Sequence, residues 1–258
     1  MLKIRDIINI IEDFAPLALQ MEGDNCGLIY GDPTVEVTGV LVTLDLTPQV
    51  AQEAINHGCN LIIEHHPSIF LPVKKIDLRY PNMGALVTAI KNDIAVYAAH
   101  TNVDFAPNGL NDYLMQILGA TDIRTVGEDV EGARIGLLPA QTTLKELADM
   151  ASVVLSNNNI RFSGHPERTI RTIAAINGGG GGSAQTVLDC IDAGADIFLT
   201  SDIKYNVIRL AKDLDYAIID IGHYDSELAF IALIAELLES KCEAKVVRAK
   251  SCTNPYYQ

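Results

Sequence analysis

Short apolar runs alternate with segments of helical periodicity, and this alternation is the feature that most constrains the fold of the chain. The first unit starts with a β-branched run at 37–44. A helical segment follows, which Thr47 can cap and Gly58 ends, and then a second apolar run at 61–63. A strand, a helix and a strand within about 30 residues are typical of a βαβ unit with parallel strands.

The second half of the chain repeats this arrangement. An apolar run at 172–176 leads into a glycine-rich loop at 178–183, a helical segment at 184–193 and another apolar run at 197–199. The sequence therefore predicts an α/β protein with two related halves. The segment near 122–133, where glycines lie among acidic residues, is the predicted boundary.

We accordingly expect a first α/β domain at residues 1–128 and a second at 129–258. The C-terminal segment is expected to return and pack against the first domain. The central sheets are expected to be mixed or parallel, with helices on their faces.

Charge and hydropathy exclude several classes of function. The net charge is −14, from 19 basic and 33 acidic side chains, and such a surface repels phosphate backbones. No apolar stretch approaches the roughly 20 residues that span a bilayer. The first 14 residues form an amphipathic pattern and not a signal peptide. We therefore expect a cytoplasmic protein with no membrane partner and no nucleic-acid partner.

The five cysteines are scattered, and no Cys-x-x-Cys pair exists. This spacing argues against a disulfide framework and against a thiolate zinc site.

Chemically active side chains follow the apolar runs at the points where strands are expected to end. In open α/β sheets such positions converge on one crevice, where ligands bind. Four of the six histidines fall there. The residues are His65 and His66, His100 and Asp104, Asp202 and Lys204, and His223 and Glu227.

Histidines and carboxylates without nearby cysteines suit zinc, iron or manganese. His223 and Glu227 are spaced i, i+4, so both can face one ion. His65 and His66 are adjacent and expected to diverge, which lets them reach two neighbouring ions. Asp104 can bridge such ions. A pair of ions lowers the pKa of a bound water and generates a nucleophile near neutral pH.

Each of these residues also has a structural interpretation. A single strand-end histidine is more often a hydrogen-bonded structural residue than a ligand. For Asp45 and Asp202, the simpler interpretation is a helix N-cap. For His100 the sequence leaves three roles open: a metal ligand, a hydrogen-bond partner of a ligand, or a proton shuttle.

The glycine run at 178–182 lacks the lysine of a phosphate-binding P-loop. Its simpler role is a loop whose backbone approaches a ligand or metal closely and opens a helix at Ser183. Anion binding by its backbone N–H groups is the alternative.

The motifs together resemble the Nif-three-like family, whose bacterial members carry the label GTP cyclohydrolase 1 type 2. They span residues 24 to 227 in the expected order, and they read DNCGLIYGD, EHHP, HTNVD with GLND, GGGGGS, TSDIKY and GHYDSE. The resemblance implies two intertwined α/β domains and a ring-shaped homohexamer.

The same resemblance implies two divalent metal ions per chain, bound by His65, His66, Asp104, His223 and Glu227. One departure concerns catalysis. Many relatives read Lys-Tyr-His after the aspartate of the TSD motif, whereas this chain has Asn206 after Lys204 and Tyr205.

Our leading hypothesis is a dinuclear metal-dependent hydrolase that acts on a small, nucleotide-like substrate. GTP cyclohydrolase-like chemistry fits, with a metal-activated water attacking the purine C8 carbon and His100 or Lys204 handling protons. The alternative is a non-catalytic protein that binds or delivers metal, since the same ligands serve both roles. A DNA clamp built on the ring is opposed by the charge of −14.

Overall fold

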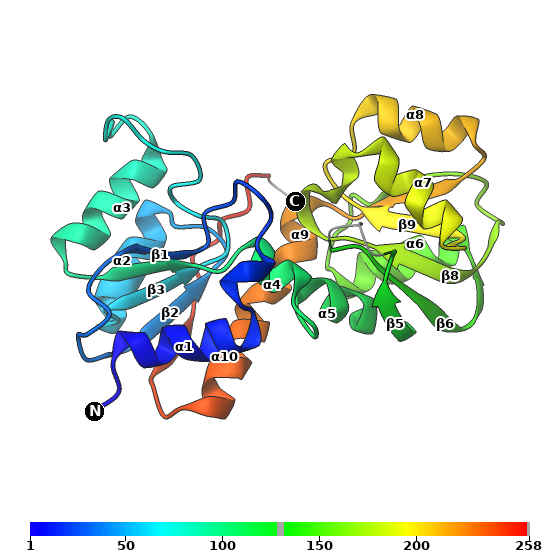
Figure 1. Cartoon of the computed structure of the whole chain (residues 1–258). Coiled ribbons are helices and arrows are strands. Elements are labelled where there is room, and N and C mark those ends of the chain that lie inside the picture. Colours follow the sequence, from blue (N-terminus) through cyan, green and yellow to red (C-terminus); the bar gives the residue numbers. More distant parts are fainter. Residues whose placement is uncertain (128–131, 257–258) are drawn as a thin grey trace. The chain divides into compact units, whose positions relative to one another are not determined.

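The computed structural model describes residues 1–127 and 132–256 and divides them into two compact units (Figure 1). The first unit comprises residues 1–106 and the C-terminal residues from 230 onward. The second unit comprises residues 107–229. The boundary predicted between residues 128 and 129 falls outside the described residues.

The first unit is built on a five-stranded sheet with the strand order β1-β4-β3-β2-β11. Only β1 runs antiparallel to its neighbour, so the other four strands are parallel. The strands are β1 (Gly27–Tyr30), β2 (Val40–Thr43), β3 (Leu61–Glu64), β4 (Ala95–Ala98) and β11 (Val246–Arg248). The helices are α1 (Ile4–Phe14), η1 (Leu17–Leu19), α2 (Pro48–His57), α3 (Pro81–Lys91), α4 (Thr101–Phe105) and α10 (Ala229–Lys241).

Helices cover both faces of this sheet. The buried residues of α2 and α3 pack with those of β2, β3 and β4 in one apolar cluster, and α1 and α10 lie on the other side (Figure 1). Helix α2 begins where the sequence predicts, because the Thr47 hydroxyl accepts a hydrogen bond from the Val50 N–H at 3.2 Å. It ends at Gly58, whose φ of 63° suits glycine.

The second unit contains a six-stranded mixed sheet with the order β5-β6-β8-β9-β10-β7. Its strands β8, β9 and β10 are parallel, and the remaining pairs are antiparallel. The strands are β5 (Thr121–Thr125), β6 (Arg134–Thr143), β7 (Arg161–Ser163), β8 (Thr169–Ala175), β9 (Ile197–Thr200) and β10 (Ala217–Asp220). The helices are α5 (Leu110–Ile117), α6 (Leu144–Val154), η2 (Gly178–Gly182), α7 (Ala184–Asp192), α8 (Tyr205–Asp213) and α9 (His223–Glu227).

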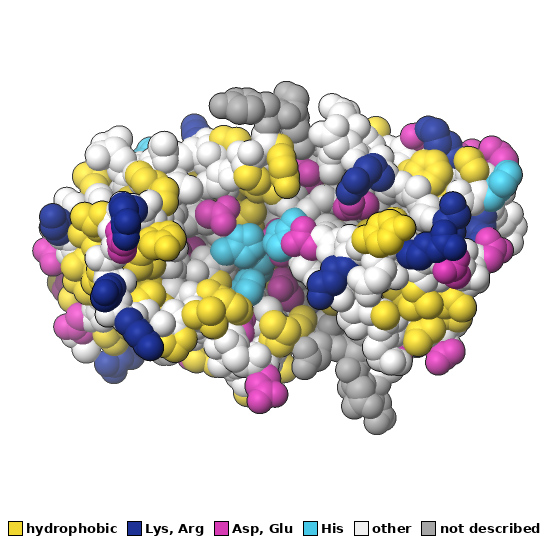
Figure 2. Space-filling view, turned by 90° about the horizontal axis from the view of Figure 1, so that it is seen from above, with side chains coloured by type: hydrophobic (Ala, Val, Ile, Leu, Met, Phe, Trp, Pro, Cys, Tyr) yellow, Lys and Arg dark blue, Asp and Glu magenta, His cyan; other side chains and the backbone are white. Residues whose placement is uncertain are grey.

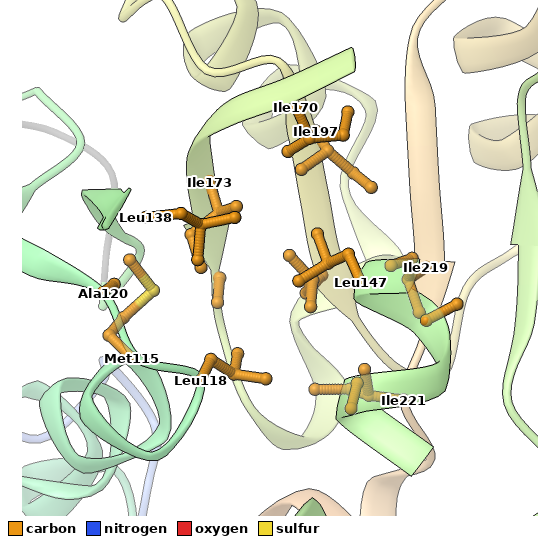
Figure 3. Packing of buried hydrophobic residues seen from close by; sticks show 14 of the residues in the cluster. Met115, Leu118, Ala120, Leu138, Leu147, Ile170, Ile173, Ile197, Ile219 and Ile221 are labelled. Carbon is orange, nitrogen blue, oxygen red and sulfur yellow. The ribbon is translucent and has the colours of Figure 1, made fainter. Parts of the chain in front are cut away.

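Two apolar clusters fill the space between this sheet and its helices. One joins α5 and α6 to one face of the sheet, and Figure 3 shows part of it, with Met115 and Leu147 packed near Ile173 and Ile219. The other joins α7 and α8 to the opposite face. The expectation of two α/β sheets with flanking helices is therefore confirmed.

The fold places the candidate residues at the carboxyl ends of parallel strands. In the first unit β3 leads to His65 and His66, and β4 leads to His100. In the second unit β9 leads to Asp202, and β10 leads to His223. Among the described residues, no helix has both the length and the apolar character that crossing a membrane requires.

Candidate metal centre

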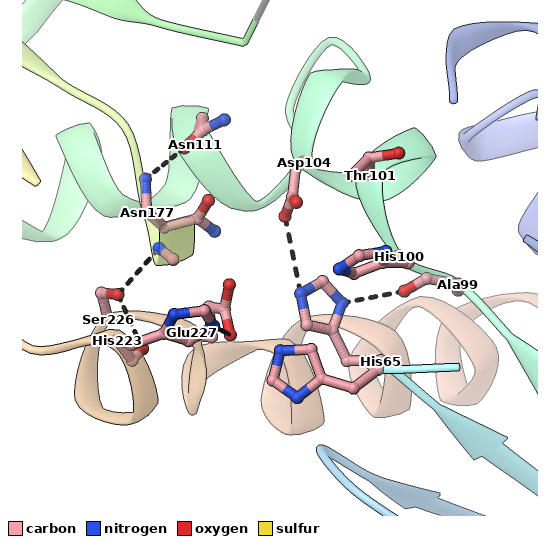
Figure 4. A network of polar contacts seen from close by, with 12 residues as sticks. His65, Ala99, His100, Thr101, Asp104, Asn111, Asn177, His223, Ser226 and Glu227 are labelled. Atoms are coloured by element: carbon pink, nitrogen blue, oxygen red, sulfur yellow. Dashed lines mark hydrogen bonds and ion pairs between the residues drawn. The ribbon is translucent and has the colours of Figure 1, made fainter. Parts of the chain in front are cut away.

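His65 is fully buried at the end of β3, and its ring orientation is fixed by the backbone. Its Nδ1 lies 2.9 Å from the carbonyl oxygen of Ala99 (Figure 4). Because a carbonyl oxygen only accepts hydrogen bonds, Nδ1 carries the proton and Nε2 of the neutral ring carries the lone pair. Nε2 faces the carboxylate of Asp104, with 3.7 Å to Oδ1.

The distance between His65 and Asp104 fits two ligands of one cation. Asp104 is a buried residue of α4, and 3.7 Å is too long for a hydrogen bond. In the neutral form of His65, a cation between Nε2 and the carboxylate replaces a repulsive contact by two attractive ones. A metal ion with ligand distances of about 2.0–2.2 Å spans such a gap.

His66 is oriented by a carboxylate. Its Nδ1 lies 2.8 Å from Oδ1 of Asp45, and its side chain is 28% exposed. The sequence favoured an N-cap role for Asp45, but Thr47 caps α2 instead. Asp45 therefore holds the ring of His66, which leaves Nε2 as the nitrogen that can bind a ligand.

His100 completes a cluster of three imidazoles in the first unit. The ring centroid of His100 lies 5.1 Å from that of His65 and 5.6 Å from that of His66. Each of the three rings offers a nitrogen, and these nitrogens lie within 4.8 Å of one another. The sequence predicted that His65 and His66 diverge, whereas their ring centroids lie 5.0 Å apart and each offers a nitrogen to the same group of three.

In the second unit, α9 presents His223 and Glu227 one turn apart. Nε2 of His223 lies 3.0 Å from Oε2 of Glu227, and Nδ1 lies 2.8 Å from Oδ2 of Asp202. Burial alone would lower the pKa of His223, but the hydrogen bonds and charges of Glu227 and Asp202 outweigh it and raise this pKa to about 9. A position that favours positive charge between carboxylates suits a metal cation equally well.

Asp202 likewise does not have the N-cap role that the sequence favoured. Lys204 occupies the N-cap position of α8, and Asp202 has a φ of 51° and orients His223. Lys204 itself is exposed beside the glycine loop. A Cβ placed on Gly182 would lie 3.6 Å from its Nζ. Asn206 is exposed on the first turn of α8.

The glycine run approaches Glu227 closely. A Cβ on Gly178 would lie 1.9 Å from Oε1 of Glu227, and the φ of Gly178 is 56°. The Gly178 N–H donates to Oγ of Ser226 at 3.2 Å, which ties the loop to α9 (Figure 4). The predicted helix start is also observed, because Oγ of Ser183 accepts from the Thr186 N–H at 3.3 Å.

One pattern unites the four strand-end histidines. Each has its Nδ1 against an oxygen atom, while the Nε2 atoms of His65 and His223 face the carboxylates of Asp104 and Glu227. Metal-binding histidines almost always have such a partner, which fixes the tautomer and raises the basicity of the ligand. Three carboxylates supply this partner, and sequence reasoning assigned no role to Asp24 and an N-cap role to Asp45 and Asp202.

Two of these histidines are accessible to solvent. His66 and His223 have side chains that are 28% and 34% exposed, and histidines reach the surface on the face shown in Figure 2. On that face Lys and Arg side chains lie among acidic and hydrophobic ones.

The chain is similar to known proteins over nearly its whole length. The family model described as Duf34/NIF3 (NGG1p interacting factor 3) matches residues 2–255. A Clostridium perfringens protein named GTP cyclohydrolase 1 type 2 homolog is 34% identical, over 99% of both chains. A Lactococcus lactis protein of the same name is 35% identical, also over 99% of both chains.

Solved structures agree over the whole length. A Staphylococcus aureus hypothetical protein has a TM-score of 0.91 and 28% identity, covering 100% of this chain and 99% of that one. Reduced HcgD from Methanocaldococcus jannaschii has a TM-score of 0.83 and 26% identity, covering 96% of this chain and 98% of that one.

Proposed function

Because the chain belongs to the Duf34/NIF3 family, we propose that it is a dinuclear metal-dependent hydrolase acting on a small, nucleotide-like substrate. One observation carries this proposal: every strand-end histidine is held through Nδ1 by an oxygen atom. Metal-binding histidines almost always have an oxygen partner of this kind on the nitrogen that does not bind the ion.

The proposed ligands are His65, His66, Asp104, His223 and Glu227, which bind two divalent ions per chain. The donors are imidazole nitrogens and carboxylate oxygens, a set that suits iron, zinc or manganese. The 3.7 Å separation of His65 and Asp104 supports this assignment in the first unit, and the 3.0 Å pair of His223 and Glu227 supports it in the second.

Bound ions of this kind supply a water acidic enough to serve as a nucleophile near neutral pH. The residues of the chain do the rest. His100 accepts a proton at Nε2, and Lys204 binds or protonates an anionic part of the substrate. The relatives' name makes GTP the first substrate to test, with attack of water at the purine C8 carbon. The proposal includes a homohexamer in the cytoplasm.

Elemental analysis of untagged protein tests the metal centre. We expect about two ions per chain, and we expect that His66→Ala and Glu227→Ala each lose metal. His165→Ala is the matched control, because His165 lies in an exposed loop and should leave the metal content unchanged. Protein that retains no metal and takes up no iron, zinc or manganese would refute the proposal.

Turnover is tested on the metal-loaded protein with GTP first and then with other nucleotides, esters and amides. Hydrolysis of the purine ring is detected as a product that has gained one water or has released formate. Loss of turnover in Glu227→Ala, with retention in His165→Ala, is the expected result.

The partial exposure of His66 and His223 favours one second candidate, a protein that delivers metal. Ligands that reach solvent exchange an ion readily. This candidate predicts rapid transfer of metal to a chelator and no turnover with any substrate, whereas the hydrolase retains its ions during catalysis.

A further inference from the structure

The Asp24 carboxylate is the most heavily hydrogen-bonded group of the DNC segment, residues 24–26, and it holds the one strand-end histidine that is not among the proposed metal ligands. Its side chain is fully buried. His100 Nδ1 lies 2.9 Å from each of its oxygens, and the Asn25 N–H donates to Oδ1 at 2.7 Å. The Thr101 N–H donates at 3.2 Å and the thiol of Cys26 at 3.3 Å, and the Thr101 hydroxyl donates as well.

These donors keep Asp24 ionised. Burial on its own would raise the pKa of Asp24, but the hydrogen bonds from His100 and Thr101 outweigh it and hold this pKa well below its usual range. A buried carboxylate stays ionised where several hydrogen bonds compensate for its lost hydration.

The arrangement determines which nitrogen of His100 is available. An ionised carboxylate only accepts hydrogen bonds, so the proton of the neutral ring lies on Nδ1 and the lone pair lies on Nε2. The ring stands edge to face against His65 and His66, and a nitrogen from each of the three lies within 4.8 Å of the others. The His100 side chain is 17% exposed.

We propose that Asp24 is a positioning residue that holds His100 in the Nδ1–H tautomer, with Nε2 directed at the cluster of three imidazoles. Any use of Nε2 in the reaction rests on the proposed hydrolase function. The positioning role rests on geometry alone.

Other hydrogen bonds of residues 21–26 hold the chain segments that carry His66 and His100. Nδ2 of Asn25 donates to the carbonyl oxygen of Ile69 at 2.6 Å, so the segment also holds the chain just after His66. The Met21 N–H donates to the Thr101 hydroxyl at 2.9 Å, next to His100. One loop therefore fixes the segments that carry both histidines.

A purely structural role for Asp24 is the competing explanation, because Asp24 also accepts the first N–H of α4 from Thr101. The two explanations differ in what they predict for the His100 ring. A structural role changes stability without a specific effect on the tautomer of His100. A positioning role changes that tautomer directly.

Nitrogen NMR of metal-free protein with nitrogen-15-labelled histidine separates the two. In the wild type we expect one His100 tautomer, with Nδ1 protonated and Nε2 not; His100→Gln assigns the signals. In Asp24→Ala and in the isosteric Asp24→Asn we expect a mixture of tautomers or a shift to Nε2–H. Asp24→Asn guards against misfolding, which circular dichroism would reveal.

Asp196→Asn is the matched control. Asp196 accepts the N–H groups of Arg171 and Thr172 at 2.8 Å each, so its substitution also removes a carboxylate with several backbone donors. We expect the His100 signals of this variant to match the wild type. Unchanged His100 signals in both Asp24 variants would overturn the inference.

Metal content tests the role of His100 itself. If Asp24 positions a His100 that is not itself a metal ligand, Asp24→Asn keeps the wild-type metal content, whereas His66→Ala loses it. Loss of metal in Asp24→Asn comparable to that in His66→Ala would overturn the assignment of His100 to a role other than metal ligand. A wild type that turns over no substrate would refute the proposed function and leave the tautomer result standing.

Discussion

Gly178 is the residue whose substitution should disturb the site most for the smallest chemical change. A Cβ at this position would overlap the carboxylate of Glu227, at 1.9 Å from Oε1, and the φ of 56° costs an alanine about 1–2 kcal/mol. We expect Gly178→Ala to lose most of its bound metal and to melt at a lower temperature. Elemental analysis and thermal denaturation measure both.

Gly179→Ala is the control for this prediction. The same loop carries Gly179, but a Cβ there meets nothing within 4 Å. We expect its metal content to equal that of the wild type. Equal metal content in Gly178→Ala and Gly179→Ala would show that the close approach to Glu227 does not matter for binding.

Asp45 offers a second prediction at the scale of the residue. It holds Nδ1 of His66 at 2.8 Å, and loss of such a partner lowers metal affinity about 10- to 100-fold. We expect this loss in Asp45→Ala, measured by competition with a chelator. Asp149→Ala, which removes an exposed carboxylate paired with Lys145 on α6, should bind metal as the wild type does.

The sequence predicts the candidate ligands better than their partners. The sequence identifies His65, His100 and His223 because each follows an apolar run, and this pattern involves only neighbouring residues. Asp24 lies 76 residues from His100 and forms its contact only through the tertiary fold. A rule based on the spacing of neighbouring residues does not predict a contact between residues so far apart in the sequence. For Asp45 and Asp202, the frequency of aspartate at helix N-caps favoured a different role.

At the scale of elements, the sequence predicts the strand–helix–strand units β2-α2-β3 and β8-α7-β9, but not the edge strands β1, β5, β7 and β11 or every boundary. Residues 223–241 form two helices in the structure, α9 and then α10. Helix α9 carries His223 and Glu227 one turn apart, and the apolar helix α10 begins at Ala229. Helical periodicity alone does not reveal such a short separate turn.

The C-terminal edge strand β11 is anchored by one carboxylate. Glu53 of α2 accepts the Lys250 N–H at 2.8 Å, the Ser251 N–H at 2.9 Å and the Ser251 hydroxyl at 2.6 Å. Burial opposes the shift, but these hydrogen bonds lower the pKa of Glu53. We expect Glu53→Gln to lose roughly 1 kcal/mol of unfolding free energy at neutral pH.

The sign of the pH dependence follows from this lowered pKa. The contribution of Glu53 is fully present above the unfolded-state pKa of about 4.3 and is lost as the pH falls through the folded-state pKa. The stability difference between wild type and Glu53→Gln should therefore shrink as the pH falls from about 5 to about 3. Urea denaturation measures it, with Glu22→Gln as the exposed control; a difference that does not change with pH would contradict the assigned role.

At the scale of the whole molecule, the motifs that span residues 24 to 227 are enough to indicate the family, and the family match over residues 2–255 confirms that resemblance. The motifs indicate the family because they lie at strand ends and in the glycine loop, where the proposed chemistry requires particular residues. The assembly and the substrate leave no comparable local pattern. Light scattering tests the proposed homohexamer, for which we expect six times the 27.9 kDa of one chain.

We expect metal binding at the proposed site to stabilise the folded chain. The first unit carries the proposed ligands His65, His66 and Asp104, and the second carries His223 and Glu227. An ion bound by either set favours the folded state of the unit that holds it. A ligand that binds only the folded state stabilises it by about 2.7 kcal/mol at 100 times its dissociation constant. We therefore expect added zinc or manganese to raise the melting temperature of metal-free wild type. It should have little effect on Glu227→Ala, while His165→Ala should respond as the wild type does. An equal rise in the wild type and Glu227→Ala would mean that the ions bind elsewhere, and the five proposed ligands would then be a structural polar network.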